Sequence, residues 1–510
     1  MKKNFILLVL SLIAMFFSKG QTYLTGFQTV ELDSSFGNNG IVITSGTVQI
    51  DKTLYTADDK LLCMGYYYKN NQIGNSDWVL ARYNYDGSLD NGFGVNGLLF
   101  NDDTCSGMVY AMAIQSDHKI LVVGKEDCGY VPFIARYNAN GAPDLAFGDH
   151  GIVMIDFISY LSSCSSLALL ENNQILLGGL LYTDSTTSTV LLKLNSDGSV
   201  DNSFGNAGLI VFDEGHEFFL SDCMVLEDGN ILCYGAEFFG YGPISDETYR
   251  VAILKLNTNG ELVTSFGNNG KLLIDVLTNA INCRTKAIEM ENNQIILGGD
   301  YFLIKLHPNG SLDDDFGNQG IIKYSCPFTD IAVWKNEQIF VAGSKMINDY
   351  DYGYSVCRFN ANGTIDETFN SMGYFDFNIS TANDYLQSII IQPDGKLLLS
   401  GSSRTTGAAN FTLVRLITDY PDVGVVEPNN DWYLQLYPNP TTGELTINNE
   451  QLTINNVEVF DVYGRRQKAE GIKQKAEGGV VIDISHLVAG VYFVKVYTEH
   501  GVFVEKVIKN

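Results

Sequence analysis

Short apolar runs separated by polar turns repeat along most of the chain. Seven times a polar turn precedes an apolar run that ends in glycine, as DDKLLCMG, DHKILVVG, NNQILLGG, DGNILCYG, NNQIILGG, NEQIFVAG and DGKLLLSG. A second apolar stretch follows each run and carries one basic residue near its end, at Arg82, Arg136, Lys193, Lys255, Lys305, Arg358 and Arg415. Runs this short between turn residues predict antiparallel β-strands.

A phenylalanine before glycine or asparagine divides the chain into regular units. It falls at Phe36, Phe93, Phe147, Phe204, Phe266, Phe316 and Phe369. A period of about 55 residues suits a four-stranded blade. Each period offers a strand after FGxxG, such as 152–157, and stretches such as 108–115, KILVVG and PFIARYN. Because such blades must stack to bury both faces, the pattern predicts an all-β, seven-bladed β-propeller over residues 21–420. It leaves open which strand begins a blade.

The two ends of the repeat region are offset from each other. The seventh unit ends at FTLVRLI, residues 411–417, without a further LDxxFG motif. The repeat region begins instead with a spare ELDSSFGNNG at 31–40. We therefore expect the N-terminal segment to pack beside the last blade and close the ring.

The polar turns carry residues that suit tight turns, such as Asp86-Gly87 and Asn140-Gly141. In five units the basic residue precedes an aspartate by eight positions, as in Arg82 and Asp90, which predicts an ion pair that braces the turn. Two alternatives remain. The oxygen ligands of Asn84, Asp86 and Asp90 could bind Ca²⁺, or the seven cations could line the central channel as an anion-binding ring. No other cofactor or metal site is predicted.

The composition is acidic, with a formal net charge of −27 and a pI near 4.5. Such a surface repels a phosphate backbone, so nucleic acid is not expected as a partner. At the N-terminus, a basic start at Lys2 and Lys3, an apolar core and a small-residue cleavage site predict a secretory signal over 1–20, with no transmembrane segment in the mature chain. The nine cysteines lack zinc-site spacing, and Cys223 with Cys233 is the pair expected on neighbouring strands.

Residues 30–418 resemble the delta-60 repeat, a bacterial propeller-type repeat without an established activity. The resemblance rests on LDxxFGxxG, a downstream DGKIL-type run and a following RYN, each seen repeatedly here. The FNSMG at 369–373 departs from the FGxxG pattern.

The periodicity changes after a linker rich in proline, asparagine and acid at 421–431, and residues 432–510 predict a small Ig-like β-sandwich. This module resembles the type A sorting domain of the type IX secretion system of Bacteroidota. The matching residues include Pro438, Asn439, Pro440, Gly464, Leu487, Gly490, Tyr492 and Lys506. The resemblance implies Sec export, passage through the outer membrane with the type IX machinery, and release or attachment to surface lipopolysaccharide.

The chain contains no GxSxG, HExxH, Walker loop or GxGxxG on a strand-to-helix turn, so no catalytic residue is predicted. Enlarged loops at 65–78, 235–249 and 343–354, expected between the third and fourth strands, gather aromatic residues on one rim. These candidate ligand-binding residues are Tyr66, Tyr67, Tyr68, Trp78, Phe238, Phe239, Tyr241, Tyr350, Tyr352 and Tyr354. They favour a secreted or surface-attached module that binds extracellular glycan or protein. The alternative is an extracellular hydrolase or lyase that acts on polysaccharide.

Overall fold

The computed structural model describes residues 30–510 apart from 69–75, 102–105, 128, 157, 159–160, 183–186, 213–217, 242–246, 277–284, 291, 326–327, 335–337, 348–350, 405–408, 419–434, 449–453, 462–465, 468–469, 475–479 and 499–500. The chain divides into two compact units, Met1–Thr418 and Asp419–Asn510. The predicted signal over 1–20 and the linker over 421–431 lie outside the described residues.

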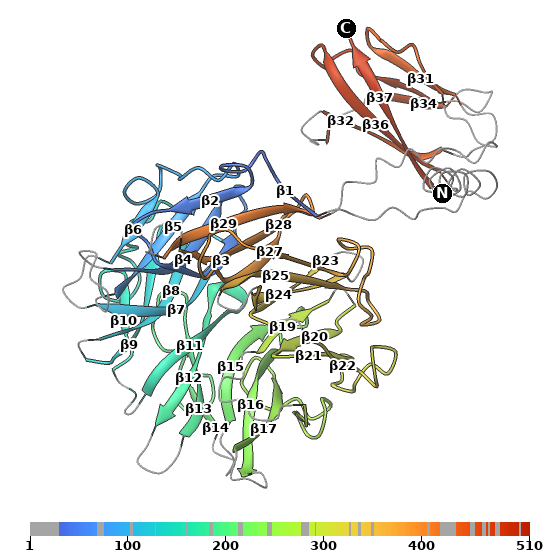
Figure 1. Cartoon of the computed structure of the whole chain (residues 1–510). Helices are drawn as coiled ribbons and strands as arrows, with labels where there is room; N and C mark the ends of the chain where they lie inside the picture. Colours follow the sequence, from blue (N-terminus) through green and yellow to red (C-terminus); the bar gives the residue numbers. More distant parts are fainter. Residues whose placement is uncertain are drawn as a thin grey trace, which may run out of the picture. The chain divides into compact units, whose positions relative to one another are not determined.

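Seven antiparallel sheets form the first unit, and Figure 1 shows them arranged radially. Blade 1 consists of β3 (Gln49–Tyr55), β4 (Leu61–Tyr68), β5 (Ser76–Tyr83) and β6 (Leu98–Phe100). Blade 2 consists of β7 (Gly107–Ile114), β8 (Ile120–Glu126), β9 (Pro132–Tyr137) and β10 (Ile152–Met154). Blade 3 consists of β11 (Leu161–Leu169), β12 (Ile175–Tyr182), β13 (Thr187–Leu194) and β14 (Leu209–Phe212), with a 3₁₀ turn at Glu171–Asn173.

The next three blades follow the same order from the inside outward. Blade 4 consists of β15 (Phe218–Val225), β16 (Ile231–Tyr241), β17 (Glu247–Leu256) and β18 (Lys271–Ile274). Blade 5 consists of β19 (Thr285–Glu289), β20 (Ile295–Gly299), β21 (Phe302–Leu306) and β22 (Ile321–Lys323). Blade 6 consists of β23 (Asp330–Trp334), β24 (Gln338–Met346), β25 (Tyr352–Phe359) and β26 (Tyr374–Phe377).

The ring closes in blade 7, which combines both ends of the propeller sequence. Its inner strands are β27 (Tyr385–Ile391), β28 (Leu397–Ser403) and β29 (Asn410–Ile417). The N-terminal strands β1 (Glu31–Leu32) and β2 (Ile41–Thr44) both pair with β29, through Glu31 with Ile417 and Ile41 with Val414. In Figure 1 the blue β2 accordingly lies beside the orange β29. The predicted closure by the N-terminal segment is confirmed.

The structure also settles which strand begins a blade. The strand that follows FGxxG is the outermost one: β10 pairs with β9 through Ile152 and Ala135. The enlarged loops therefore lie between the second and third strands of their blades, and their expected place between the third and fourth is wrong. The second and third strands are apolar along most of their length because neighbouring blades cover both faces. In β8 and β9, for example, the residues from Ile120 to Gly124 and from Pro132 to Tyr137 are all buried.

The recurring turns join each blade to the next. Between blades 1 and 2, the Gly94 N–H donates to the Asn140 carbonyl at 2.9 Å. Gly141 has a φ of +86°, and a Cβ there would lie 3.1 Å from the Phe93 ring. This position needs glycine both for its backbone angle and for the close approach of the ring. The repeated turn motif, which runs from the Asp-Gly or Asn-Gly pair to FGxxG, therefore forms a joint between neighbouring blades.

Each repeated basic residue forms an ion pair at this joint. The five predicted pairs are confirmed, with N to O distances of 2.7 to 3.4 Å, at Arg82–Asp90, Arg136–Asp144, Lys193–Asp201, Lys305–Asp313 and Arg358–Asp366. Arg415 pairs with Asp33 across the closure seam at 2.8 Å. Lys255 pairs with Asp228 at 2.9 Å, since Val263 replaces the usual aspartate. The alternative that these cations line the central channel is wrong.

The second unit is a β-sandwich with its own core. One sheet contains β30 (Gln435–Tyr437), β31 (Glu444–Asn448), β35 (Val480–Asp483) and β34 (Glu470–Gln474). The other contains β33 (Arg466–Gln467), β32 (Ile454–Asp461), β36 (Gly490–Thr498) and β37 (Gly501–Lys509). Between the sheets lie buried residues such as Leu445, Val459, Ile482 and Val494. Within the described ranges, no helix is long and apolar enough to cross a membrane.

Candidate functional site

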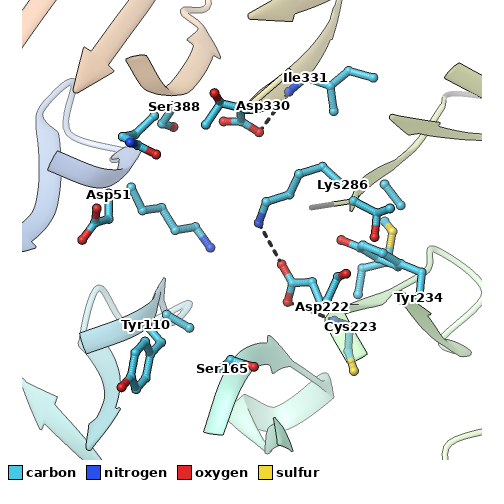
Figure 2. A pocket seen from close by; sticks show the side chains of 18 of the residues that line it. Asp51, Tyr110, Ser165, Asp222, Cys223, Tyr234, Lys286, Asp330, Ile331 and Ser388 are labelled. Atoms are coloured by element: carbon cyan, nitrogen blue, oxygen red, sulfur yellow. Dashed lines mark hydrogen bonds and ion pairs between the residues drawn. The ribbon is translucent and has the colours of Figure 1, made fainter. Parts of the chain in front are cut away.

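A cavity of about 820 Å³ lies at the centre of the propeller, lined by the innermost strands of all seven blades. Figure 2 shows this opening, with side chains from several blades pointing into it. The register of the inner strands explains which residues reach the opening. In every blade, one inner-strand residue pairs with the residue that precedes the last glycine of the second strand's apolar run. These seven equivalent residues, which we call the channel ring, are Lys52, Ala111, Ser166, Asp222, Lys286, Asp330 and Ser388. All of them except the fully buried Ser166 line the cavity.

A β-bulge precedes the channel ring in five blades. In each, one residue is skipped in the pairing, and a bulge of this kind re-aims a side chain. The skipped residues all line the cavity: they are Asp51, Tyr110, Ser165, Ser221 and Gln387. The wall therefore offers carboxylate, phenol, hydroxyl and amide groups above a ring that carries two lysines and two aspartates.

Blades 4 and 5 contribute an ion pair to the ring. Lys286 Nζ lies 3.2 Å from Asp222 Oδ2 (Figure 2), and Asp222 Oδ1 accepts hydrogen bonds from the Ser166 hydroxyl at 2.7 Å and the Cys223 N–H at 2.9 Å. Burial raises the pKa of Asp222, but the charges of Lys286 and Lys52 and the hydrogen bonds from Ser166 and Cys223 together outweigh burial, and the pKa is lowered. Asp222 is therefore held as a carboxylate.

Asp330, in blade 6, behaves differently. Its Oδ1 accepts from the Ile331 N–H and its Oδ2 from the Ile389 N–H of blade 7, each at 3.0 Å. Burial nevertheless raises the pKa of Asp330, against the opposing effect of Lys286. The ring thus contains two carboxyl groups whose pKa values are shifted in opposite directions.

Lys52 of blade 1 is the second cation of the ring. Among the described residues it forms no hydrogen bond and no ion pair, although it lines the cavity. Burial lowers the pKa of Lys52 and the charge of Lys286 lowers it further, against the opposing charges of Asp222 and Asp330. In Figure 2 the adjacent Asp51 lies across the opening from Lys286, so the two lysines come from opposite sides of the channel.

The channel residues were not among those predicted from the sequence. In the sequence they appear as charged side chains within short strands, as in QIDKTLY or TKAIE. A charged residue in a solvent-exposed edge strand gives the same sequence pattern, so the pattern does not identify a channel. Only the register shows that these charges share one level.

Several of the predicted rim aromatics pack against other rings of their own blade or of the next blade. Trp78 is 4% exposed and packs against Tyr137, and Tyr354 is fully buried beside Phe377, so neither belongs to a rim surface.

Of the remaining rim residues, Tyr66, Tyr67 and Tyr68 are half-buried at the end of β4. Tyr67 contacts Phe100, Phe238 contacts Tyr249, and Tyr352 contacts Tyr385. Phe239 and Tyr241 end strand β16, and Tyr350 lies outside the described residues.

The three proposed calcium ligands are occupied by protein donors. Asp86 Oδ1 accepts from the Ser88 hydroxyl and N–H, and Asp90 Oδ2 accepts from Arg82 Nε at 2.8 Å. Asn84 Oδ1 accepts from Lys60 Nζ at 2.6 Å. Across the part of the chain that the structure describes, no group of three or more His, Cys, Asp or Glu side chains is placed to hold a metal ion.

The sorting-motif residues gather around the end of the last strand. Asn439 Nδ2 donates to the Lys506 carbonyl at 2.6 Å, and the Ile508 N–H donates back to Asn439 Oδ1 at 2.9 Å. Pro438 and Pro440 flank this asparagine in an exposed turn, and the Tyr492 hydroxyl donates to the Val488 carbonyl. Leu487 packs against the sandwich core, Gly490 begins β36, and Gly464 lies outside the described residues.

Two family models match the chain, one in each unit. The model described as "Secretion system C-terminal sorting domain" matches residues 435–510. The model described as "Domain of unknown function (DUF5122) beta-propeller" matches residues 56–93, 115–147, 170–204 and 338–369. The chain is a repeat β-propeller with a secretion sorting domain. Its sorting domain directs export by the type IX secretion system to the cell surface or the extracellular space.

Several solved structures are similar to this propeller at low identity. The polysaccharide lyase Uly1 has a TM-score of 0.44 at 11% identity, covering 79% of this chain and 94% of its own. A PL25 ulvan lyase bound to -[GlcA(1-4)Rha3S]- has a TM-score of 0.42 at 11% identity, covering 75% and 95%. Drosophila Semaphorin 2a has a TM-score of 0.34 at 9% identity, covering 94% and 98%. At these scores the likeness carries no argument about function. No curated protein matches the sequence.

Proposed function

We propose that the protein is an exported binding propeller whose central channel holds an extracellular glycan. The observation that supports this most is the channel wall, where Tyr110 is 39% exposed and lines the same cavity as the hydroxyl and amide groups of Ser165, Ser221 and Gln387. Aromatic faces pack against sugar rings, and hydroxyl, amide and carboxylate groups hydrogen-bond to sugar hydroxyls. A cavity of about 820 Å³ lies within the range of known small-molecule sites.

The rim tyrosines fit this proposal as an extension of the channel mouth. The charge of Asp51, which lines the cavity, is one of the influences that raise the pKa of Tyr66, after the larger effect of burial. Tyr66 also pairs with Gln49 of the inner strand, two residues before Asp51, so a glycan longer than the cavity would pass near it on leaving.

Binding is tested by probing a glycan array with the full exported chain, with and without calcium. A hit is then measured by calorimetry against Tyr110→Ala and against Tyr130→Ala, which removes a tyrosine that is 69% exposed and does not line the cavity. We expect at least a tenfold loss of affinity for the first variant and none for the second. Equal affinity for both variants would place the ligand elsewhere, and an array without hits would contradict glycan binding. Calcium-dependent binding would return Asp86 and Asp90 to consideration as ligands.

A second candidate function is turnover of an extracellular polysaccharide by a lyase or hydrolase. It is favoured by Asp330, whose pKa is raised by burial, and Lys52, whose pKa is lowered by burial, in one cavity. A carboxyl with a raised pKa and an amine with a lowered pKa are a combination suited to general acid–base catalysis. New chain ends released from a bound glycan, and lost with Asp330→Asn, would support this candidate. An intact glycan after prolonged incubation would contradict it.

A further inference from the structure

The two aspartates of the channel ring are already satisfied by the protein. Asp222 accepts from Lys286, Ser166 and the Cys223 N–H, and Asp330 accepts from two backbone N–H groups. The charges of Asp222 and Asp330 also stabilise the Lys286 ammonium, since they raise the pKa of Lys286 against the effect of burial. The charges of both carboxylates also act on Lys52 of blade 1, but within the described residues neither carboxylate forms a hydrogen bond or an ion pair with it, and their effect on its pKa is smaller than that of burial and of the Lys286 charge.

That cation, Lys52, lines the cavity without a hydrogen bond or ion pair among the described residues. Removing an ammonium from bulk water without a partner is unfavourable, and folding alone would favour an uncharged residue here. The equivalent positions on either side of it show that the site tolerates such residues, since Ala111 is its neighbour in blade 2 and Ser388 in blade 7. These small side chains also leave room beside the ammonium.

We propose that Lys52 is an anion subsite of the channel and that the glycan it receives is acidic, carrying a carboxylate or a sulfate group. This inference rests on the proposed function and names the class of ligand. An anionic group placed beside Lys52 would form the charge-assisted pair that the protein does not supply. The acidic chain as a whole, with a net charge of −27, repels such a ligand at long range. Recognition must then come from this short-range contact.

The first experiment compares acidic and neutral forms of the same sugar, using calorimetry on the full exported chain. The probes are a galacturonic acid tetrasaccharide, its fully methyl-esterified form, and a sulfated carrageenan tetrasaccharide. We expect the methyl ester to bind at least tenfold more weakly than one of the two acidic probes, because it lacks the charge that pairs with Lys52. Which acidic probe binds distinguishes a carboxylate from a sulfate.

The second experiment uses variants of the lysine itself. Lys52→Met keeps most of the side-chain volume and should remove the preference for the acidic probe, whereas Lys52→Arg should keep it within a few-fold. Lys323→Met, which changes an exposed lysine outside the cavity, is the control and should change nothing. Lys52→Met should melt no lower than the parent chain, because it removes an unpaired charge rather than a bridge.

The outcomes separate this inference from the function on which it rests. Binding of neutral glycans with Tyr110 dependence, but no preference for an acidic probe, would leave channel binding intact and overturn the anion subsite. Unchanged acidic binding in Lys52→Met, or a marked loss of stability in that variant, would also overturn it. Absence of binding to every glycan would contradict both proposals.

Discussion

Asp33→Asn should weaken the closure of the propeller. Asp33 lies in the segment that the N-terminus contributes to blade 7, and its Oδ2 accepts from Arg415 Nε of β29 at 2.8 Å. The side chains of both residues are nearly inaccessible, at 5% and 1% exposure. Lys396 approaches the same carboxylate at 3.2 Å, and the Ser35 hydroxyl donates to its Oδ1 at 2.6 Å. The amide would lose the negative charge with which Arg415 and Lys396 pair.

The magnitude follows from the pKa of Asp33. Burial alone would raise this pKa, but hydrogen bonds from Ser35 and the charges of Arg415 and Lys396 lower it from 3.8 to about 2. By linkage, this shift corresponds to about 2 kcal/mol of folding free energy. Leaving the buried Arg415 guanidinium without its carboxylate adds to the loss, so we expect a decrease in the free energy of unfolding of about 3 kcal/mol.

The pH dependence has a definite sign. Because the folded pKa is depressed, the contribution of Asp33 is fully present above pH 3.8 and is lost as the pH falls toward 2. In Asp33→Asn this component of the acid sensitivity should be absent.

The assay is urea denaturation at pH 7 and at pH 3, with limited proteolysis of residues 30–44 as a probe of the seam. Asp90→Asn is the matched control: it removes the same pair with Arg82, at 2.8 Å, but inside a continuous chain and at a more exposed site. For this control we expect the free energy of unfolding to decrease by about 1 kcal/mol, with no new proteolytic cleavage in the seam. If the two variants lost equal stability, or if Asp33→Asn lost less than the control, the seam pair would not hold the ring closed.

Three further predictions test the inter-blade joints and the thiols. Gly198→Ala should lower the melting temperature by more than Gly46→Ala does. Both glycines have φ above +80°, so the backbone strain is similar, but only at Gly198 would the new Cβ lie 2.9 Å from the Phe147 ring. The difference between the two melting temperatures therefore measures the cost of this steric contact. Phe147→Ala should cost about 3 to 5 kcal/mol in urea denaturation, because its fully buried ring lies under the Arg136 guanidinium, and a loss below about 1 kcal/mol would contradict its place in the joint. Cys223 and Cys233 are free thiols here with Sγ atoms 3.3 Å apart on paired strands, so peptide mapping of the exported protein should find them joined; two alkylated thiols after export would refute this.

The repeated parts of the fold could be predicted from the sequence because each blade needs them. The glycine that meets Phe93 and the cation that pairs with Asp90 recur, and comparing units within one chain identified both. The spare motif at 31–40 predicted the seam by the same logic. The one unit that departs from this pattern keeps the ion pair with a different partner. Val263 replaces the aspartate there, and Lys255 pairs instead with Asp228 of the preceding turn.

The channel could not be predicted in this way because it depends on strand register. Asp222 follows a bulge at Leu220, and Lys286 pairs with Gly298 without one, so their spacing from the nearest motif differs although they meet at 3.2 Å. Two of the predicted rim aromatics, Trp78 and Tyr354, are buried for a related reason. A loop counted from the sequence includes residues that extend the strands, as with Trp78 in β5 and Tyr354 in β25, and these rings are then buried between blades.

The contrast between the joints and the channel ring indicates where selection for function acts. Every blade presents nearly the same environment at the ring position, with the same strand pairing and the same glycine beside it. A purely structural role would favour one residue type there, as it does for the phenylalanine of the joints. Instead the position holds lysine, alanine, serine, aspartate, lysine, aspartate and serine in turn. A ring with this order has no rotational symmetry, so it suits a ligand that is itself asymmetric, with its anionic group at one side and neutral hydroxyls at the other.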